Sequence, residues 1–283
     1  MGRQAQRLRQ LIDSGEHFIA AEAYSALTGR IVERIGFKAA YLGGHACSAF
    51  HYAMPDIGIF SQVEQIEQAA RIVAAIDIPL IVDADTLGET VADAFHYTRR
   101  YERAGIAGIH VEDEANPKHS SYVQRLIPIP AMQARIEACV KARHDPPFVI
   151  IARCDELFPV DRTGGGGGSV EEAIRRGCAY AEAGADALVY PVAPPEALLQ
   201  VKKAIPVPLI VSGRVMPQAA CTLYGGYGWM GAARLHIERS RELFKTGKVD
   251  ANLQIEDKAA LIEEDVFGDV IADWAKKTGR PTR

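Results

Sequence analysis

The sequence lacks the features of a membrane or secreted protein. None of its apolar runs approaches the roughly 20 residues that a membrane-spanning helix needs. The N-terminal stretch, residues 1–18, is basic but has neither the apolar region nor the cleavage site of a signal peptide. The five cysteines include no C-x-x-C pair; they are Cys47, Cys139, Cys154, Cys178 and Cys221. We therefore expect a cytoplasmic protein whose thiols are reduced and structurally buried rather than metal ligands.

An excess of positive charge is also absent. The 283 residues include 32 Lys and Arg against 36 Asp and Glu, which gives a formal net charge of −4. A nucleic acid or an anionic membrane would favour a basic surface, so neither is an expected partner. Hydrophobic residues make up 48% of the chain. This length and composition suit one large α/β domain, or two smaller ones, with a sizeable buried core.

Short apolar runs alternate with longer helical patterns along most of the chain. Seven runs are predicted strands, at 18–23, 39–44, 79–85, 108–113, 148–155, 187–192 and 208–213. Helical patterns separate most of them, and those at 61–76 and 169–184 each open on a serine with a glutamate three residues later. That arrangement is a capping box, which marks the start of a helix. Strands that alternate with helices favour parallel pairing through right-handed crossovers.

A closed barrel needs an eighth strand. The segment 226–231 has a poor composition for a strand but lies at the right place in the chain. We predict an α/β fold, a (β/α)₈ TIM-type barrel over 1–247, with an open doubly wound sheet as the alternative. Residues 248–283 form a helical extension with an apolar stripe at helical spacing, made of Phe267, Val270, Ile271 and Trp274. The stripe packs either on its own barrel or on a neighbouring subunit.

Acidic residues gather where two predicted strands end. Asp83 and Asp85 close the third strand, and Glu112 closes the fourth. Active sites of (β/α)₈ barrels lie at the carboxyl ends of the strands, and residues two apart on a strand point the same way. Such close carboxylates repel each other without a cation, and hard oxygen ligands suit Mg²⁺ or Mn²⁺. The pattern predicts a metal site; helix caps or ion pairs are the alternative.

Four segments resemble signatures of the isocitrate lyase / phosphoenolpyruvate mutase superfamily. They are Pro55-Asp56, DADT at 83–86, VEDEANPK at 111–118 and IARCDE at 151–156, and in order and spacing they cover nearly the whole chain. The resemblance implies a (β/α)₈ barrel, a bound Mg²⁺ and an enolate-type intermediate. It also implies a homotetramer in which a C-terminal helix swaps between neighbouring subunits, which would explain the apolar stripe.

The resemblance also implies roles for single residues. Asp83, Asp85 and Glu112 match acids that hold the metal, directly or through its waters. Lys118 matches the lysine of a gating loop, and Arg153 matches an arginine whose planar guanidinium pairs with a substrate carboxylate. The predicted catalytic residues are Asp56, Lys118, Ser120 and Arg153. The predicted substrate-binding residues are Tyr41, Gly43, Gly44, His45, Arg153 and Ser212.

Three segments depart from the family pattern. Ser120 stands where isocitrate and methylisocitrate lyases carry a cysteine, and a serine hydroxyl is a much weaker acid than a thiol. Gly43-Gly44-His45 replaces the usual Ser-Gly-Gly, so His45 is an added acid, an acceptor for another substrate group, or a polar wall residue. The glycine run at 164–168 lacks the lysine of a phosphate-binding loop and is a mobile lid or an inert flexible loop.

Two further histidines lie close to these motifs. His110 is next to Val111 within a predicted strand, and we expect it to pack against the helices. His119 follows Lys118 in the gating loop and is the histidine to test first.

These features predict a Mg²⁺-dependent carbon–carbon lyase, of the carboxy-lyase or oxo-acid-lyase type. Its substrate would be a small 2-oxo or 2-hydroxy carboxylic acid, and the metal would stabilise an enolate. The alternative within the same fold is P–C bond chemistry on a phosphonate, because Ser121 would match a serine of the phosphoenolpyruvate mutases. The alternative outside enzymes is a barrel that binds a small acid without converting it.

Overall fold

The computed structural model describes residues 2–118, 126–159, 167–249 and 258–280. The chain divides into two compact units, Met1–Gly231 and Ala232–Arg283. The predicted boundary after residue 247 stays a prediction.

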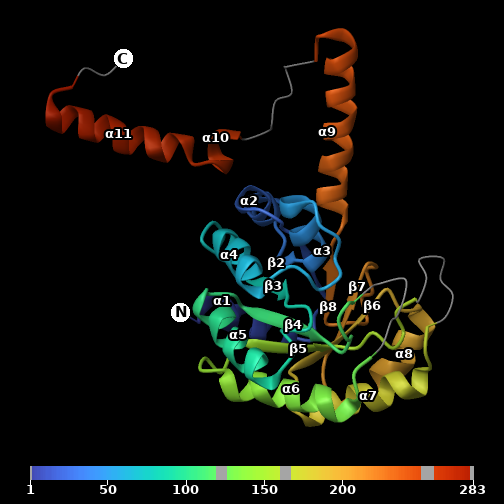
Figure 1. Ribbon diagram of the computed structural model, residues 1–283. Coiled ribbons are helices and arrows are strands. Elements are labelled where there is room, and N and C mark those ends of the chain that lie inside the picture. The colour runs from blue at the N-terminus through green and yellow to red at the C-terminus, as the bar shows by residue number, and fades with distance from the viewer. Residues whose placement is uncertain (1, 119–125, 160–166, 250–257, 281–283) are drawn as a thin grey trace. The chain divides into compact units, whose positions relative to one another are not determined.

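The first unit is a closed barrel of parallel strands (Figure 1). The strands are β1 (Phe18–Glu22), β2 (Ala39–Leu42), β3 (Leu80–Asp83), β4 (Gly108–Glu112), β5 (Val149–Arg153), β6 (Ala187–Pro191), β7 (Leu209–Ser212) and β8 (Cys221–Tyr224). Each strand pairs with the next, and β8 pairs with β1 through the register Phe18 to Cys221. The predicted (β/α)₈ barrel is therefore confirmed, and the open doubly wound sheet is excluded.

Helices cover the outside of the strands (Figure 1). These are α2 (Ala26–Ile35), α4 (Gln62–Val73), α5 (Val91–Arg103), α6 (Ile129–Ala142), α7 (Val170–Glu182) and α8 (Pro195–Ala204). The first unit also contains α1 (Arg3–Asp13), α3 (Gly44–Ala46) and the π-helical turn η1 (Cys47–His51). The seven strands predicted from the sequence all form, within one or two residues of the predicted ends.

The predicted eighth strand was wrong. Strand β8 is Cys221–Tyr224, and residues 226–231 lie at the start of helix α9 (Tyr227–Thr246). A short connection without a helix joins β7 to β8, so the regular alternation of strand and helix placed the eighth strand too late. The local composition points to the correct segment, because Cys-Thr-Leu-Tyr is β-prone and the following glycines are not.

The two predicted capping boxes have different outcomes. The Ser61 hydroxyl accepts from the Glu64 N–H, and Glu64 accepts in return from the Ser61 N–H. Ser169 accepts from the Glu172 N–H in the same way, but the Glu172 carboxylate turns to Arg175 and Arg176. The second helix start is therefore correct as a serine cap, while the reciprocal half of its box is replaced by ion pairs.

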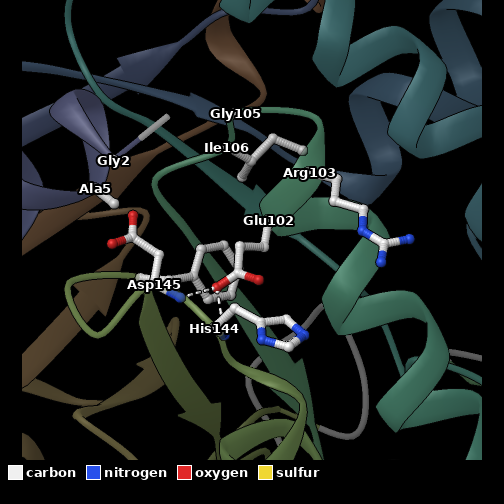
Figure 2. A pocket seen from close by; sticks show the side chains of 9 residues that line it. Gly2, Ala5, Glu102, Arg103, Gly105, Ile106, His144 and Asp145 are labelled. Atoms are coloured by element: carbon white, nitrogen blue, oxygen red, sulfur yellow. Dashed lines mark hydrogen bonds between the residues drawn. The ribbon is translucent and has the colours of Figure 1, made fainter.

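Helix α1 closes the N-terminal end of the barrel. Its Leu8 and Ile12 are buried in the same cluster as the inward-facing side chains of the strands. A cavity of about 400 Å³ lies beside this helix, lined in part by Glu102, His144 and Asp145 (Figure 2). The Glu102 carboxylate accepts from the backbone N–H groups of His144 (2.8 Å) and Asp145 (2.6 Å). These contacts stabilise the end of the barrel opposite to the carboxyl ends of the strands.

The second unit is helical. It contains most of α9, then α10 (Lys258–Leu261) and α11 (Glu264–Thr278). The predicted apolar stripe lies on α11 and is exposed, with Phe267 at 62% and Trp274 at 47% of full exposure. Among the described residues, no helix combines the length and the apolar character that crossing a membrane requires.

Candidate metal centre

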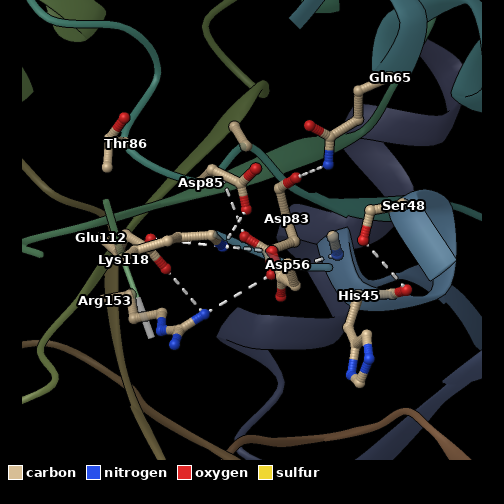
Figure 3. A network of polar contacts seen from close by, with 12 residues as sticks. His45, Ser48, Asp56, Gln65, Asp83, Asp85, Thr86, Glu112, Lys118 and Arg153 are labelled. Atoms are coloured by element: carbon tan, nitrogen blue, oxygen red, sulfur yellow. Dashed lines mark hydrogen bonds and ion pairs between the residues drawn. The ribbon is translucent and has the colours of Figure 1, made fainter. Parts of the chain in front are cut away.

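The carboxyl ends of β3 and β4 carry a buried group of three carboxylates (Figure 3). One oxygen each from Asp83, Asp85 and Glu112 lies within 4.8 Å of the others. All three side chains are buried. The structure therefore brings together the residues that the sequence predicts as metal ligands.

A turn, rather than the alternation of a strand, places Asp85 next to Asp83. Strand β3 ends at Asp83, and Asp85 has a φ of 50°, in the left-handed region that aspartate adopts more readily than most residues. The Asp85 N–H then donates to Asp83 Oδ1 at 3.0 Å. The two carboxylates meet as predicted, but the reason differs from the strand periodicity assumed from the sequence.

Gly44 closes one side of the acid group. Its N–H donates to Asp83 Oδ2 at 3.3 Å, and a Cβ at this position would lie 2.6 Å from Asp85 Oδ1. The neighbouring Gly43 has more room, since the atoms nearest to a Cβ there belong to the Tyr41 side chain, at 3.4 Å. Gly44 is therefore required for the close approach of the backbone to the carboxylates.

Lys118 supplies a buried positive charge. Its Nζ lies 3.0 Å from Asp56 Oδ1 and 3.4 Å from Glu112 Oε1, and it also contacts Asp85. Burial alone would lower the pKa of Lys118, but Asp85, Glu112 and Asp56 outweigh it and hold the pKa well above its usual value. Asp56 and Lys118, each predicted as a catalytic residue, thus meet at the edge of the acid group.

Arg153 supplies a second positive charge, at the end of β5. Its Nη1 lies 2.9 Å from Glu112 Oε2 and 3.6 Å from Asp83 Oδ2, and its Nε lies 2.9 Å from Asp155 Oδ2. Burial raises the pKa of Asp155 to about 8, although Arg153 lowers it in part. Burial also raises the pKa of Asp83, but His110, Lys118 and Arg153 together bring it below the usual value.

His110 was predicted to pack against the helices, and that prediction was wrong. It lies two residues before Glu112 on β4, so its side chain points into the barrel as Glu112 does. Its Nε2 lies 3.2 Å from the Tyr41 hydroxyl, and its Nδ1 lies 3.4 Å from Asp83 Oδ1. Burial lowers the pKa of His110 to about 4, so the ring is neutral at pH 7. The position of His110 two residues before Glu112 is the sequence signal that its side chain points into the barrel.

The remaining predicted residues lie around this group in different ways. Tyr41 is buried at the end of β2, and Ser212 is half-buried at the end of β7. His45 is exposed, and Figure 3 shows its ring turned away from the carboxylates. Ser120, with His119 and Ser121, lies outside the described residues. The same holds for residues 164–166 of the glycine run.

The donor set fits a hard divalent cation. The three side chains offer carboxylate oxygens alone, which is the ligand type that Mg²⁺, Mn²⁺ and Ca²⁺ prefer. Asp83 and Glu112 end the neighbouring strands β3 and β4, and Asp85 lies in the turn after β3. All three are thus at the carboxyl end of the barrel, which is the catalytic end of this architecture. Fold and site together define a (β/α)₈ barrel of the enzyme type with a buried acidic group that fits a divalent cation.

Comparison with known proteins agrees with this class. The family model described as phosphoenolpyruvate phosphomutase matches residues 8–225. The chain belongs to this family, which is part of the superfamily that the sequence motifs indicated.

Two curated relatives and one solved structure show the range of the family around this chain. A 2,3-dimethylmalate lyase from Eubacterium barkeri is 36% identical over 184 residues, which are 64% of this chain and 61% of the relative, under two thirds of its length. A phosphonopyruvate hydrolase from Variovorax sp. (strain Pal2) is 33% identical over 90% of both chains. A crystal structure of phosphonopyruvate hydrolase with oxalate and Mg²⁺ has a TM-score of 0.82 at 30% identity, covering 95% of this chain and 98% of the other.

Proposed function

We propose that this chain is a Mg²⁺-dependent carbon–carbon lyase acting on a small 2-oxo or 2-hydroxy carboxylic acid. The observation that carries the proposal is the buried group of Asp83, Asp85 and Glu112, whose carboxylate oxygens lie within 4.8 Å at the catalytic end of the barrel. The structure of a family member with oxalate and Mg²⁺ supports both the metal and the type of ligand.

Each residue of the centre has a role in this proposal. Asp83, Asp85 and Glu112 would hold the cation. When bound, Mg²⁺ would polarise the substrate and take up the negative charge of an enolate. The Arg153 guanidinium would bind the substrate carboxylate, and Asp155 would keep it in place through its contact with Nε. Lys118, oriented by Asp56, would stabilise charge on the opposite side, and Ser120 would come from the loop that follows it.

The kind of bond that is broken has two candidates. The 2,3-dimethylmalate lyase supports cleavage of a C–C bond. The phosphonopyruvate hydrolase supports P–C chemistry, since its similarity extends over 90% of both chains. Both reactions leave a charge next to a carbonyl, so the same metal centre serves either one.

A substrate screen separates the candidates. Oxaloacetate, 2-alkylmalates and phosphonopyruvate would each be tested with Mg²⁺ and with a chelator, and the released pyruvate or 2-oxo acid and phosphate would be measured. We expect metal-dependent 2-oxo acid release without phosphate release. Phosphate release from phosphonopyruvate would instead establish the P–C alternative. Calorimetric binding of oxalate with Mg²⁺, but no turnover of any substrate, would support the non-catalytic barrel.

A matched pair of variants tests the metal centre itself. Asp83→Ala should abolish turnover of whichever substrate is used, because it removes a ligand from the centre of the group. Asp269→Ala removes an exposed acid of α11 and should leave turnover unchanged. Full turnover by Asp83→Ala would contradict the proposed mechanism.

We also propose that the chain forms a homotetramer in which α11 packs on a neighbouring copy. Its apolar residues are more than half exposed at Val266, Phe267, Val270 and Ile271, which is unusual for a helix that stays free in solution. Sedimentation should give the mass of a tetramer. Phe267→Asp should reduce that mass, while Lys276→Gln on the charged face should not. A monomeric wild-type chain would contradict the proposal.

A further inference from the structure

Glu22 ends strand β1 beside the catalytic end of the barrel, and its contacts reach the start of α9. The side chain is buried, and both carboxylate oxygens accept from backbone N–H groups. Oε1 accepts from the Gly226 N–H at 2.5 Å, and Oε2 accepts from the N–H groups of Gly228 (2.7 Å) and Trp229 (3.1 Å). A carboxylate at a helix N-terminus satisfies amides that have no partner within the helix and complements the helix dipole. Glu22 therefore anchors the first turn of α9.

The glycines of this segment fit closely around that anchor. A Cβ at Gly228 would lie 2.8 Å from Glu22 Oε2 and 3.2 Å from the Tyr24 ring. A Cβ at Gly225 would lie 3.1 Å from the Tyr41 ring. The backbone between β8 and α9 therefore depends on Gly225, Gly228 and the Glu22 carboxylate. This backbone in turn places the side chain of Trp229.

Trp229 in turn contacts His45. The two rings are 5.0 Å apart at an interplanar angle of 65°, an edge-to-face pair (in which the edge of one ring meets the face of the other). His45 directly follows Gly44, whose N–H reaches Asp83 in the acid group. His45 follows Gly44 of the acid group and is exposed, and Trp229 is half-buried beside it, which puts the pair at the rim of the site, between the acid group and solvent. The His45 ring points away from the carboxylates (Figure 3), which separates it from the atoms at the metal centre.

We propose that the edge-to-face pair of His45 and Trp229 forms a wall of the substrate site and selects substrates by the end that lies away from the metal. Glu22 is the positioning residue that holds this wall in place. The inference rests on the proposed function, because it concerns the substrate of the same centre. The part of the acid held by the cation and Arg153 lies at the carboxylates. The part beyond the broken bond reaches the rim, where an imidazole hydrogen-bonds a polar or anionic group and an indole flanks it. His45 is thus a wall residue and does not transfer a proton at the reacting carbon.

Selectivity between two substrates tests the wall. For wild type, Trp229→Leu, His45→Leu and Glu22→Gln, kcat/KM would be measured with 2-methylmalate and with 2,3-dimethylmalate, which differ by one methyl group on the carbon beyond the broken bond. We expect the ratio of the two values to change about tenfold in all three variants, mostly through KM. Glu22→Gln should act like Trp229→Leu although Glu22 is not expected to touch the substrate. Oxalate with Mg²⁺ is too short to reach the rim, so its affinity should stay at the wild-type value.

The control variant is Tyr227→Ala. Tyr227 belongs to the same first turn of α9 but packs edge-to-face on Tyr224 and is 49% exposed. Its replacement should leave the selectivity ratio unchanged. Wild-type selectivity ratios in Trp229→Leu and His45→Leu would contradict the proposed wall. An equal change of the ratio in Tyr227→Ala would also contradict it, because any disturbance of α9 would then have the same effect.

A second readout does not depend on turnover. The sequence has two tryptophans, Trp229 and Trp274, so Trp274→Phe makes indole fluorescence a report on Trp229 alone. Adding Glu22→Gln should shift the emission to longer wavelength, because the first turn of α9 is released and the indole becomes more exposed. Unchanged emission overturns the role of Glu22 by itself. Absence of turnover on every substrate overturns the proposed function and the wall with it, whereas turnover with unchanged selectivity overturns the wall alone.

Discussion

The Lys118 Nζ lies 3.0 Å from Asp56 Oδ1, and the side chain of Lys118 has no exposed surface. Its other contacts are Asp85 and Glu112, two of the three candidate metal ligands. A buried ammonium in this position balances part of the charge that a divalent cation would balance. Lys118 and the metal are therefore expected to influence each other.

Replacing Lys118 tests that relationship. Lys118→Met should lower the free energy of unfolding of the metal-free protein by about 3–5 kcal/mol, because buried carboxylates lose their partner. Mg²⁺ should then raise the melting temperature by more than it does in wild type, because the Lys118 ammonium no longer competes with the metal for the carboxylates. Lys141→Met, at an exposed position on α6, is the control. An unchanged stability of metal-free Lys118→Met would contradict the prediction.

The two neighbouring glycines predict different sensitivities. Gly44→Ala places a Cβ 2.6 Å from Asp85 Oδ1 and must displace that carboxylate, so we expect the Kd for Mg²⁺ to rise at least about tenfold. Gly43→Ala meets the Tyr41 ring at 3.4 Å, an ordinary contact, and should leave the Kd unchanged. Calorimetric titration of both variants measures the difference. Equal metal affinity in the two would show that Gly44 does not shape the site.

The two helix caps predict that loss of a glutamate destabilises the start of α4 more than the start of α7. Ser61→Ala should cost about 1 kcal/mol, since the Glu64 N–H loses its acceptor. Glu64→Ala should also destabilise α4, because the Ser61 N–H loses its own acceptor, the Glu64 carboxylate. Glu172→Ala should not affect the cap of α7 in this way, since its carboxylate contacts arginines instead. Urea unfolding of the three variants tests the order, and equal losses for the two glutamates would contradict it.

The cysteines predict selective labelling. Cys178 is half-buried, while the four others are buried. Burial raises the pKa of Cys139 to about 11, and burial likewise raises the pKa of Cys47, Cys154 and Cys221. A raised thiol pKa leaves little thiolate, the reactive form, near neutral pH. A maleimide or disulfide reagent should therefore modify one thiol per native chain at pH 8, and Cys178→Ser should remove it. Labelling of a second thiol before unfolding would contradict the packing.

Much of the barrel was predictable from local patterns. Seven strands were recognised because strands covered on both faces are continuous apolar runs, and the helix starts were marked by Ser61 and Ser169. The eighth strand was misplaced because the chain goes from β7 to β8 without a helix. Spacing rules do not detect such an omission, although the β-prone composition of 221–224 does.

The candidate site was predictable in its residues more than in its geometry. Asp83, Asp85 and Glu112 were identified from strand ends, yet the left-handed turn at Asp85 became evident only in the structure. His110 was assigned to the wrong face although it lies two residues before Glu112. Glu22 was not recognised at all, since its partners are backbone amides 204 to 207 residues away in the chain.

The sequence by itself determined the number and order of most elements and the acidic character of their ends, because hydrophobic periodicity, caps and strand-end residues act over a few positions. Only the tertiary structure decided which of these residues meet. Barrel closure joins β1 to β8, and with it Glu22 to the start of α9 and Trp229 to His45. It also surrounds Asp83, Asp85 and Glu112 with Lys118 and Arg153. Such contacts depend on the register and curvature of the closed sheet, which no local pattern encodes.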